Sequence, residues 1–311
     1  MKAPRNKTID ISIEDGRTYL ERCIRLHGPA ALDTVLDKTI TGDIFETLPQ
    51  LPRGFADLVI VDPPYNLSKD FGGNKFRQIS DEAYEEYTES WLLPVLPLMK
   101  KTGSIYVCCD WQSSAAIGRV LKRHLHVQNR ITWQREKGRG AKSNWKNCSE
   151  DIWFATVSDN YTFNAGAVKQ RRRVIAPYRE EGAPKDWEIT ENGNFRNSFA
   201  SNFWDDISIP YWSMPENTAH PTQKPEKLLA KLILASSNEG DTVLDPFLGS
   251  GSTSVTAKKL GRHYVGIEQN EQYCLWCEKR LEMAETDKSI QGYSDGVFWE
   301  RNTAALQKKY K

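Results

Sequence analysis

The sequence predicts an α/β fold in which helices cover both faces of a mostly parallel sheet, and three observations support this. Short apolar runs recur along the chain, and turn residues bound each of them. Several runs are continuous and β-branched instead of alternating, which is typical of strands buried on both faces. Helical patterns lie between many of the runs, and such alternation of strands and helices favours an α/β sheet.

These patterns divide the chain into regions. The seven expected strands are TITGD (39–43), DLVIVD (57–62), GSIYVCCD (103–110), RITWQRE (130–136), DIWFATV (151–157), DTVLDPF (241–247) and HYVGIE (263–268). The expected helices cover 81–100, 111–124, 224–237 and 250–261. Residues 158–219 are polar, aromatic and rich in Gly, Pro and Asn, which is typical of a functional loop region or a small subdomain. We therefore expect a peripheral segment at 1–38, two halves of one domain at 39–157 and 220–285, this insertion between them, and a tail at 286–311.

The composition is that of a soluble globular protein, with 39% hydrophobic and 27% charged residues among 311. No apolar stretch is long enough to span a bilayer, and the N-terminus lacks the hydrophobic core of a signal peptide. The six cysteines form no spaced framework, and adjacent Cys108 and Cys109 in a strand-like run favour reduced thiols. These features predict a cytoplasmic protein without membrane contact.

The net charge of +1 conceals a local bias, because ten basic residues face four acidic ones between Arg130 and Arg173. A basic zone of this kind is expected where a protein contacts a polyanion, although a solvated surface gives the same count. Two other features do not indicate a metal. The CLWC segment (274–277) lies in a helical run without a second cysteine pair, which favours core packing, and His124 and His126 lack companion ligands.

The stretch DTVLDPFLGSGST (241–253) predicts a strand, a glycine-rich turn and the start of a helix, which together cradle nucleotides in doubly wound sheets. Gly249 and Gly251 allow the backbone to approach a ligand closely. Glu268 follows at the end of the next strand, where an acid can accept the hydroxyls of a ribose. Asp245 would repel a pyrophosphate but suits an amino group. These features favour an amino-acid nucleoside such as S-adenosylmethionine over a dinucleotide such as NAD.

The stretch DLVIVDPPYN (57–66) ends a buried strand on an acid and then stiffens the chain. The lone pair of an exocyclic amine on a nucleobase is delocalised into the ring. An enzyme that methylates this amine must therefore accept hydrogen bonds from it while the nitrogen becomes pyramidal. Asp62 and the carbonyl of Pro63 can accept them, because the prolines fix the local φ angles. Tyr65 offers a face for base stacking, worth about 1–3 kcal/mol.

Three segments together resemble a known family: DPPYN (62–66), HPTQKP (220–225) and DPFLGSGST (245–253). They are similar to the β group of DNA amino-methyltransferases, in restriction–modification or orphan form, in which the catalytic motif precedes the cofactor motif. The resemblance covers most of residues 39–285. It implies a circularly permuted, Rossmann-like S-adenosylmethionine-dependent sheet of seven strands, mostly parallel with one antiparallel. It also implies that the insertion is a target recognition region.

The resemblance assigns roles residue by residue. The amine-binding motif comprises Asp62, Pro63, Pro64 and Tyr65, with Asp62 also close to the methyl donor. The donor-binding set comprises Asp43 beside the adenine, Thr222 and Lys224 near the methionine end, Asp245 at the amino group, the loop residues Phe247, Gly249, Ser250, Gly251, Ser252 and Thr253, and Glu268 at the ribose. Lys224 would neutralise the donor carboxylate. Asp in the first motif position favours adenine N6 over cytosine N4, which stays the alternative.

The expected substrate is double-stranded DNA with its target base flipped out, at a cost of a few kcal/mol. Trp133 is either a base contact or a core aromatic, and the loop at 137–147 is suited to receive the base. The expected phosphate contacts are Lys75, Arg135, Arg139, Lys142, Arg171, Arg172 and Arg173. The sequence leaves open RNA as substrate, a cognate restriction endonuclease, a homodimer, and a nucleic-acid-binding protein without catalysis. No metal is expected, since a sulfonium is already an activated leaving group.

Overall fold

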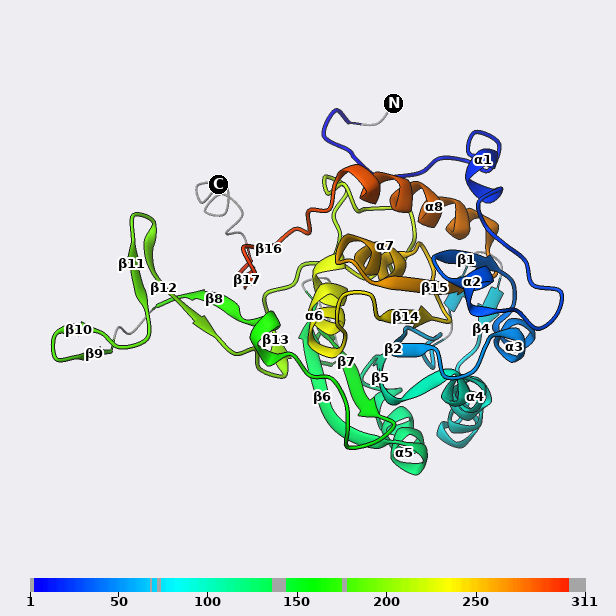
Figure 1. The fold of residues 1–311 in the computed structure, drawn as a ribbon, viewed down its shortest axis with the longest axis horizontal. Coiled ribbons are helices and arrows are strands. Elements are labelled where there is room, and N and C mark those ends of the chain that lie inside the picture. Colours follow the sequence, from blue (N-terminus) through cyan, green and yellow to red (C-terminus); the bar gives the residue numbers. More distant parts are fainter. Residues whose placement is uncertain (1–2, 68, 72–73, 136–143, 175–177, 302–311) are drawn as a thin grey trace.

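A mixed β-sheet forms the centre of the computed structural model, which describes residues 3–67, 69–71, 74–135, 144–174 and 178–301 (Figure 1). Within these residues eight strands pair in the order β1-β15-β14-β2-β5-β7-β6-β13. The strands are β1 (Lys38–Thr41), β15 (His263–Glu268), β14 (Thr242–Asp245), β2 (Ala56–Val61), β5 (Met99–Cys109), β7 (Ser149–Thr156), β6 (His126–Gln134) and β13 (Phe203–Trp204). Within this described sheet only β7 runs antiparallel to its neighbours. The predicted α/β fold is confirmed, and the two residues of β13 add one strand to the seven expected.

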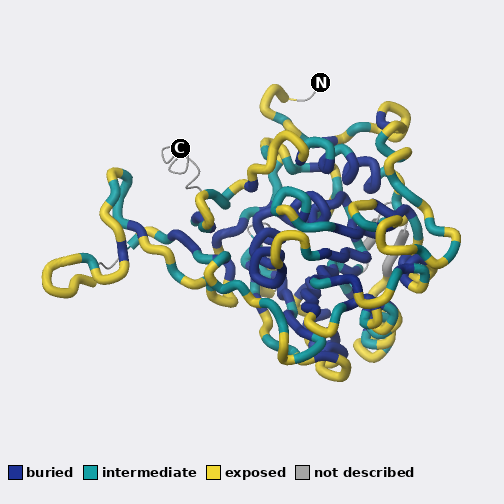
Figure 2. Tube along the Cα trace, in the orientation of Figure 1, coloured by how far each residue is buried: buried dark blue, intermediate teal, exposed yellow. Residues whose placement is uncertain are grey.

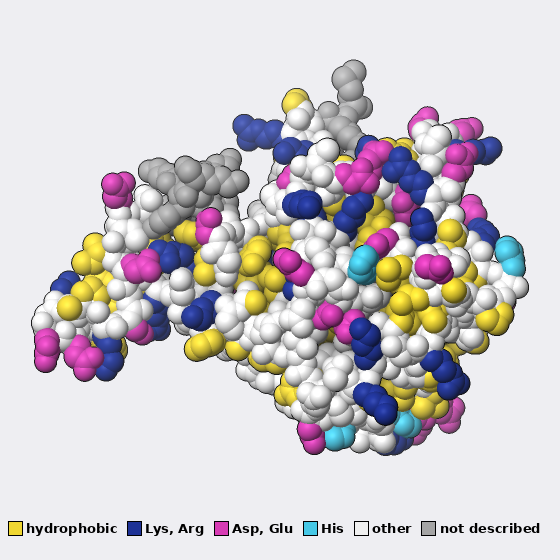
Figure 3. Space-filling view, in the orientation of Figure 1, with side chains coloured by type: hydrophobic (Ala, Val, Ile, Leu, Met, Phe, Trp, Pro, Cys, Tyr) yellow, Lys and Arg dark blue, Asp and Glu magenta, His cyan; other side chains and the backbone are white. Residues whose placement is uncertain are grey.

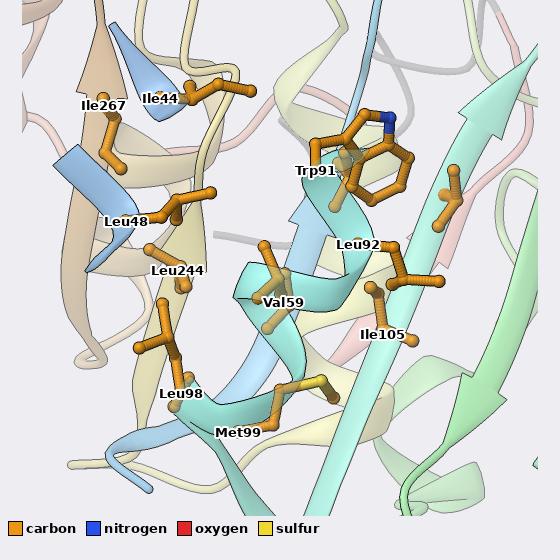
Figure 4. Close-up of a cluster of buried hydrophobic side chains, with 14 of the residues drawn as sticks. Ile44, Leu48, Val59, Trp91, Leu92, Leu98, Met99, Ile105, Leu244 and Ile267 are labelled. Atoms are coloured by element: carbon orange, nitrogen blue, oxygen red, sulfur yellow. The ribbon is translucent and has the colours of Figure 1, made fainter. Parts of the chain in front are cut away.

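Helices cover both faces of the sheet. Successive side chains of each strand point to opposite sides, so each face carries apolar side chains that a layer of helices buries. Val59 of β2 packs with α3 (Ile44–Thr47), α4 (Asp81–Val95) and α5 (Ser114–His124). Its neighbours Leu58 and Ile60 pack with α6 (Glu226–Ser236), α7 (Ser252–Lys259) and α8 (Glu271–Thr286). Figure 4 shows the first cluster, in which Trp91 and Leu92 of α4 lie against Val59 and Ile105. Each such buried aliphatic side chain stabilises the fold by about 1.5–3 kcal/mol.

The insertion builds an arm that projects from this body (Figure 1). It contains η3 (Ala165–Val168), β8 (Gln170–Arg173), β9 (Arg179–Glu180), β10 (Ala183–Pro184), β11 (Glu188–Thr190) and β12 (Gly193–Ser198). β11, β12 and β8 continue into β17 (Val297–Trp299) and β16 (Tyr293–Ser294) to form a second sheet. Figure 2 shows that the arm is largely exposed toward its tip and buried near the body. The segment expected to be a separate tail thus pairs with the insertion.

The N-terminal segment lies across both halves of the chain. It contains α1 (Arg17–Leu20) and α2 (Leu32–Val35), and Ile9 bridges to Thr218 while Ile24 bridges to Ile40. Three further pieces connect the main elements: η1 (Leu48–Gln50), η2 (Leu96–Leu98), and the hairpin of β3 (Lys69–Phe71) and β4 (Asn74–Phe76). No helix in the described ranges is long and apolar enough to cross a membrane.

Candidate active site

The two sequence motifs meet because β2 and β14 are neighbours in the sheet. Val243 pairs with Leu58, and Leu244 with Val59, so the residues that follow both parallel strands emerge at the same edge. A cavity of about 250 Å³ opens there. Its lining includes thirteen of the residues predicted for catalysis or donor binding: Asp62, Pro63, Pro64, Tyr65, Thr222, Lys224, Asp245, Phe247, Gly249, Ser250, Ser252, Thr253 and Glu268. Ligands of open α/β sheets bind at this edge.

The two loop glycines differ in what they allow. Gly249 has a φ of 55° and lines the cavity, where an added Cβ would lie 3.1 Å from Nε2 of His220. Gly251 has a φ of 83° and precedes α7, but it is absent from the cavity lining. An added Cβ there would lie only 2.2 Å from Sγ of Cys277 on α8. Gly251 therefore allows the loop to pack on a helix, whereas the sequence predicted that it faces the ligand.

Two carboxylates flank the loop, of which Asp245 is buried and Glu268 is half-buried. Asp245 accepts a hydrogen bond from the amide of Phe247 at 2.9 Å, and burial raises its pKa to about 7. Glu268 accepts from the amides of Gly249 and Asn270, each at 2.8 Å, and burial raises its pKa as well. Ser250 has a buried hydroxyl without a hydrogen-bond partner among the described residues. The cavity therefore offers acceptors, and one unsatisfied hydroxyl, to a ligand that carries amino and hydroxyl groups.

The catalytic motif is part of a compact charge cluster. Nζ of Lys224 lies 2.6 Å from Oδ2 of Asp62 and 3.0 Å from the Tyr65 hydroxyl. That hydroxyl donates to Oδ1 of Asp62 at 2.9 Å. Burial alone would lower the pKa of Lys224, but the carboxylates of Asp62 and Glu150 raise it, so the ammonium stays charged. Burial and the same two acids raise the pKa of Tyr65, which stays a neutral donor. The sequence predicted a donor carboxylate as the partner of Lys224, whereas in the structure it is Asp62.

Glu150 is the main residue that the sequence did not identify. It is 5% exposed, lines the cavity and forms an ion pair with Arg135. It lies at the start of β7, directly before Asp151, which pairs with Cys109 at the end of β5. Because β7 is antiparallel, its first residues lie at the edge where the parallel strands end. An acid just before a predicted strand was the available signal, but strand direction was needed to interpret it.

The structure also places the residues predicted to bind DNA, and two of these predictions are wrong. Trp133 is 1% exposed and donates its indole N–H to the carbonyl of Ile207, so it is a core aromatic and no base can stack on it. Arg171 is 8% exposed, pairs with Glu188 and lies over the rings of Phe195 and Trp299. Its guanidinium holds the second sheet together and does not face a phosphate.

The remaining predicted phosphate contacts, and Asp43 from the donor-binding set, lie in different environments. Arg135 lines the cavity through its ion pair, Arg172 pairs with Asp205, and Arg173 lies on the exposed surface. Asp43 is exposed and caps α3 by accepting from the amide of Phe45 at 2.8 Å, outside the cavity lining. Arg139, Lys142 and the side chain of Lys75 lie outside the described residues. On the face shown in Figure 3, basic and acidic side chains are interspersed over the arm and the body.

The features expected not to bind metal divide between the core and the surface. Cys274 and Cys277 of α8 are fully buried, as the sequence predicted for the CLWC segment. His124 pairs with Glu89, and His126 with Asp159, both near the surface. No group of three or more metal-ligating side chains occurs within the part of the chain that the structure describes.

Comparisons with known proteins agree with this geometry. The family model described as DNA methylase (N6_N4_Mtase) matches residues 56–279. DNA adenine methyltransferase YhdJ of Escherichia coli K12 is 34% identical over 257 residues, covering 79% of this chain and 82% of that protein. Type II methyltransferase M.HpaI of Haemophilus parainfluenzae is 32% identical over 248 residues, covering 79% and 74%. The crystal structure of an M1.HpyAVI–SAM complex superposes with a TM-score of 0.54 at 23% identity, covering 78% of this chain and 98% of that one. The chain belongs to the N6/N4 DNA methylase family.

Proposed function

We propose that this protein transfers a methyl group from S-adenosylmethionine to the exocyclic N6 of adenine in double-stranded DNA. The observation that carries the proposal is the position of Asp62, which shares one cavity with the glycine-rich loop after β14. A donor held by the loop and an amine held by Asp62 would therefore meet in the same space. Family membership supports the choice of reaction, and the relative named as a DNA adenine methyltransferase supports the choice of base.

The donor subsite consists of the residues around the loop after β14. Asp245 and Glu268 supply acceptors for amino and hydroxyl groups, Ser250 supplies a hydroxyl, and Phe247 supplies an apolar wall that packs edge-on against Trp91. When bound there, S-adenosylmethionine supplies a methyl carbon activated by its sulfonium. The buried Asp245 gains most from a cationic amino group, because an opposite charge offsets the cost of its ionisation.

The acceptor subsite consists of the motif after β2. Asp62 accepts a hydrogen bond from the amino group, and the carbonyl of Pro63 accepts a second one. Both bonds draw the nitrogen lone pair out of conjugation with the ring while the new N–C bond forms. Asp62 is also placed to take the proton that the methylated nitrogen must lose. Tyr84 donates to the carbonyl of Pro64 at 3.0 Å, which fixes the motif relative to α4.

DNA would approach over the segment before β7. Trp145 is 93% exposed, and Asn147 and Ser149 of the same segment line the cavity. We propose that Trp145 contacts the flipped base or its neighbours, the role that the sequence had offered to Trp133. The cytoplasmic location stays a prediction of the sequence. A restriction endonuclease partner and a homodimer are left open by the sequence, and sedimentation of the purified protein tests the homodimer.

The test is methylation of DNA by the purified protein with isotope-labelled S-adenosylmethionine, followed by mass spectrometry of the nucleosides. We expect labelled N6-methyladenine from the wild type and at most a trace from Asp62→Ala, which keeps its fold by circular dichroism. Labelled N4-methylcytosine would establish the alternative base instead. If the wild type produces no more methylated base than Asp62→Ala while both bind DNA, a nucleic-acid-binding protein without catalysis is the better description.

A further inference from the structure

Glu150 occupies the centre of the charge cluster but has no role in the reaction as described so far. Its Oε2 lies 3.2 Å from the Tyr65 hydroxyl and 3.5 Å from Nζ of Lys224. Its Oε1 faces the guanidinium of Arg135. The two carboxylates of Asp62 and Glu150 thus both contact the same ammonium and the same phenol.

This arrangement matters because both oxygens of Asp62 are already in contact with donors. Lys224 approaches Oδ2 at 2.6 Å, and Tyr65 donates to Oδ1 at 2.9 Å. An amine that loses electron density to a new methyl group becomes positively charged. The Lys224 ammonium, held close to Asp62, repels that positive charge. Asp62 can therefore accept a hydrogen bond from the amine fully only after its contacts with Lys224 and Tyr65 lengthen or break.

Lys224 cannot simply withdraw into water. It is 8% exposed, and an ammonium in so dry a place requires another anion nearby. Glu150 is that anion, because its Oε2 is already within 3.5 Å and Arg135 fixes it from the other side. The Tyr65 hydroxyl has one proton and two carboxylates within reach, so it too can turn from Asp62 to Glu150. Asp62, Glu150, Lys224 and Arg135 carry two negative and two positive charges, which balance in either arrangement.

We propose that Glu150 is a positioning residue for methyl transfer: it receives Lys224 and Tyr65 when Asp62 turns to the amino group of the target. The inference rests on the proposed function, since it assumes that Asp62 binds the amine. Glu150→Gln keeps the shape and one acceptor oxygen but removes the charge that draws Lys224 away. Lys224 would then stay on Asp62.

The test compares the single-turnover rate of methyl transfer with the affinities for donor and DNA. For Glu150→Gln we expect a rate roughly 10- to 100-fold lower, because a misplaced catalytic group can cost about 100-fold. Donor and DNA dissociation constants should change much less than the rate. Glu150→Asp keeps the charge but shortens its reach, so its rate should lie between those of Glu150→Gln and the wild type. Asp151→Asn is the matched control, because Asp151 is a buried acid on the same strand that lies outside the cavity lining.

The outcomes separate this inference from the proposed function. An active wild type whose rate is matched by Glu150→Gln overturns the inference alone, as expected if Lys224 moves to the donor carboxylate instead. Equal losses in Glu150→Gln and Asp151→Asn also overturn it, since they indicate a structural effect. If Glu150→Gln does not fold, Glu150→Asp decides, and a wild-type rate in that variant refutes the idea. An inactive wild type refutes both proposals.

Discussion

The packing of Gly251 against α8 predicts an unusually costly substitution in the loop after β14. In Gly251→Ala, a residue with a φ of 83° must adopt the left-handed region, which costs about 1–2 kcal/mol. The new Cβ would also lie 2.2 Å from Sγ, 2.7 Å from Cβ and 3.0 Å from Cα of Cys277. Overpacking of this kind costs a further 1–3 kcal/mol, roughly. The free energy of unfolding should therefore fall by about 2–5 kcal/mol.

Gly261→Ala is the matched control for backbone strain. Gly261 has a φ of 73°, but the atom nearest to an added Cβ is Cγ of Glu239 at 3.7 Å. This variant should lose only the strain term, about 1–2 kcal/mol. Urea unfolding followed by tryptophan fluorescence measures both losses, provided that the slopes agree. A Gly251→Ala midpoint no lower than that of Gly261→Ala would contradict the packing argument.

A second-site change tests the same contact. Cys277→Ala removes Sγ, the atom only 2.2 Å from the added Cβ, but leaves the Cβ and Cα of residue 277 in place. In this background Gly251→Ala should cost less than in the wild type, yet still more than Gly261→Ala. Additive losses would mean that Cys277 is not the obstacle, because residues in contact show a coupling energy in a double-mutant cycle.

Two further predictions concern the site and the DNA-binding surface. The pKa of Asp245 is raised from 3.8 to about 7, so the folded protein binds more protons than the unfolded chain between these values, and the free energy of unfolding should fall as pH rises across that window. Asp245→Asn should reduce this dependence in urea titrations at pH 5 and pH 7, while burial of Glu216, whose pKa is raised to about 7, leaves part of it in place. The variant should also weaken donor binding most above pH 7, where the acid is ionised. Trp133→Ala should destabilise the fold by about 3–5 kcal/mol, because a large core side chain is lost. Trp145→Ala should leave stability unchanged and weaken binding of a DNA duplex; the opposite result for the pair would refute their assignment as core and surface residues.

The sequence by itself determined the local elements and the chemistry of the motifs. Continuous apolar runs such as DLVIVD and DTVLDPF predict buried strands because burial on both faces leaves no polar positions, and the structure places β2 and β14 there. The acid of DPPY (62–65) and the glycines of the loop after β14 can be recognised from the sequence alone, because each follows directly after an apolar run. The seven apolar runs predicted the number of strands as well, but the single antiparallel strand followed only from the resemblance to a family.

Only the tertiary structure decided which side chains share an environment. Lys224 and Asp62 are far apart in the chain, and they meet because the segment before α6 crosses the carboxyl edge of β2. Glu150 reaches the same point because β7 runs antiparallel. Trp133 is buried in the core, where its strand pairs with β13 and its indole N–H donates to the carbonyl of Ile207. The physical reason is common to all three. Strand direction and the covering of a face depend on contacts between distant segments, and no local pattern of residues encodes them.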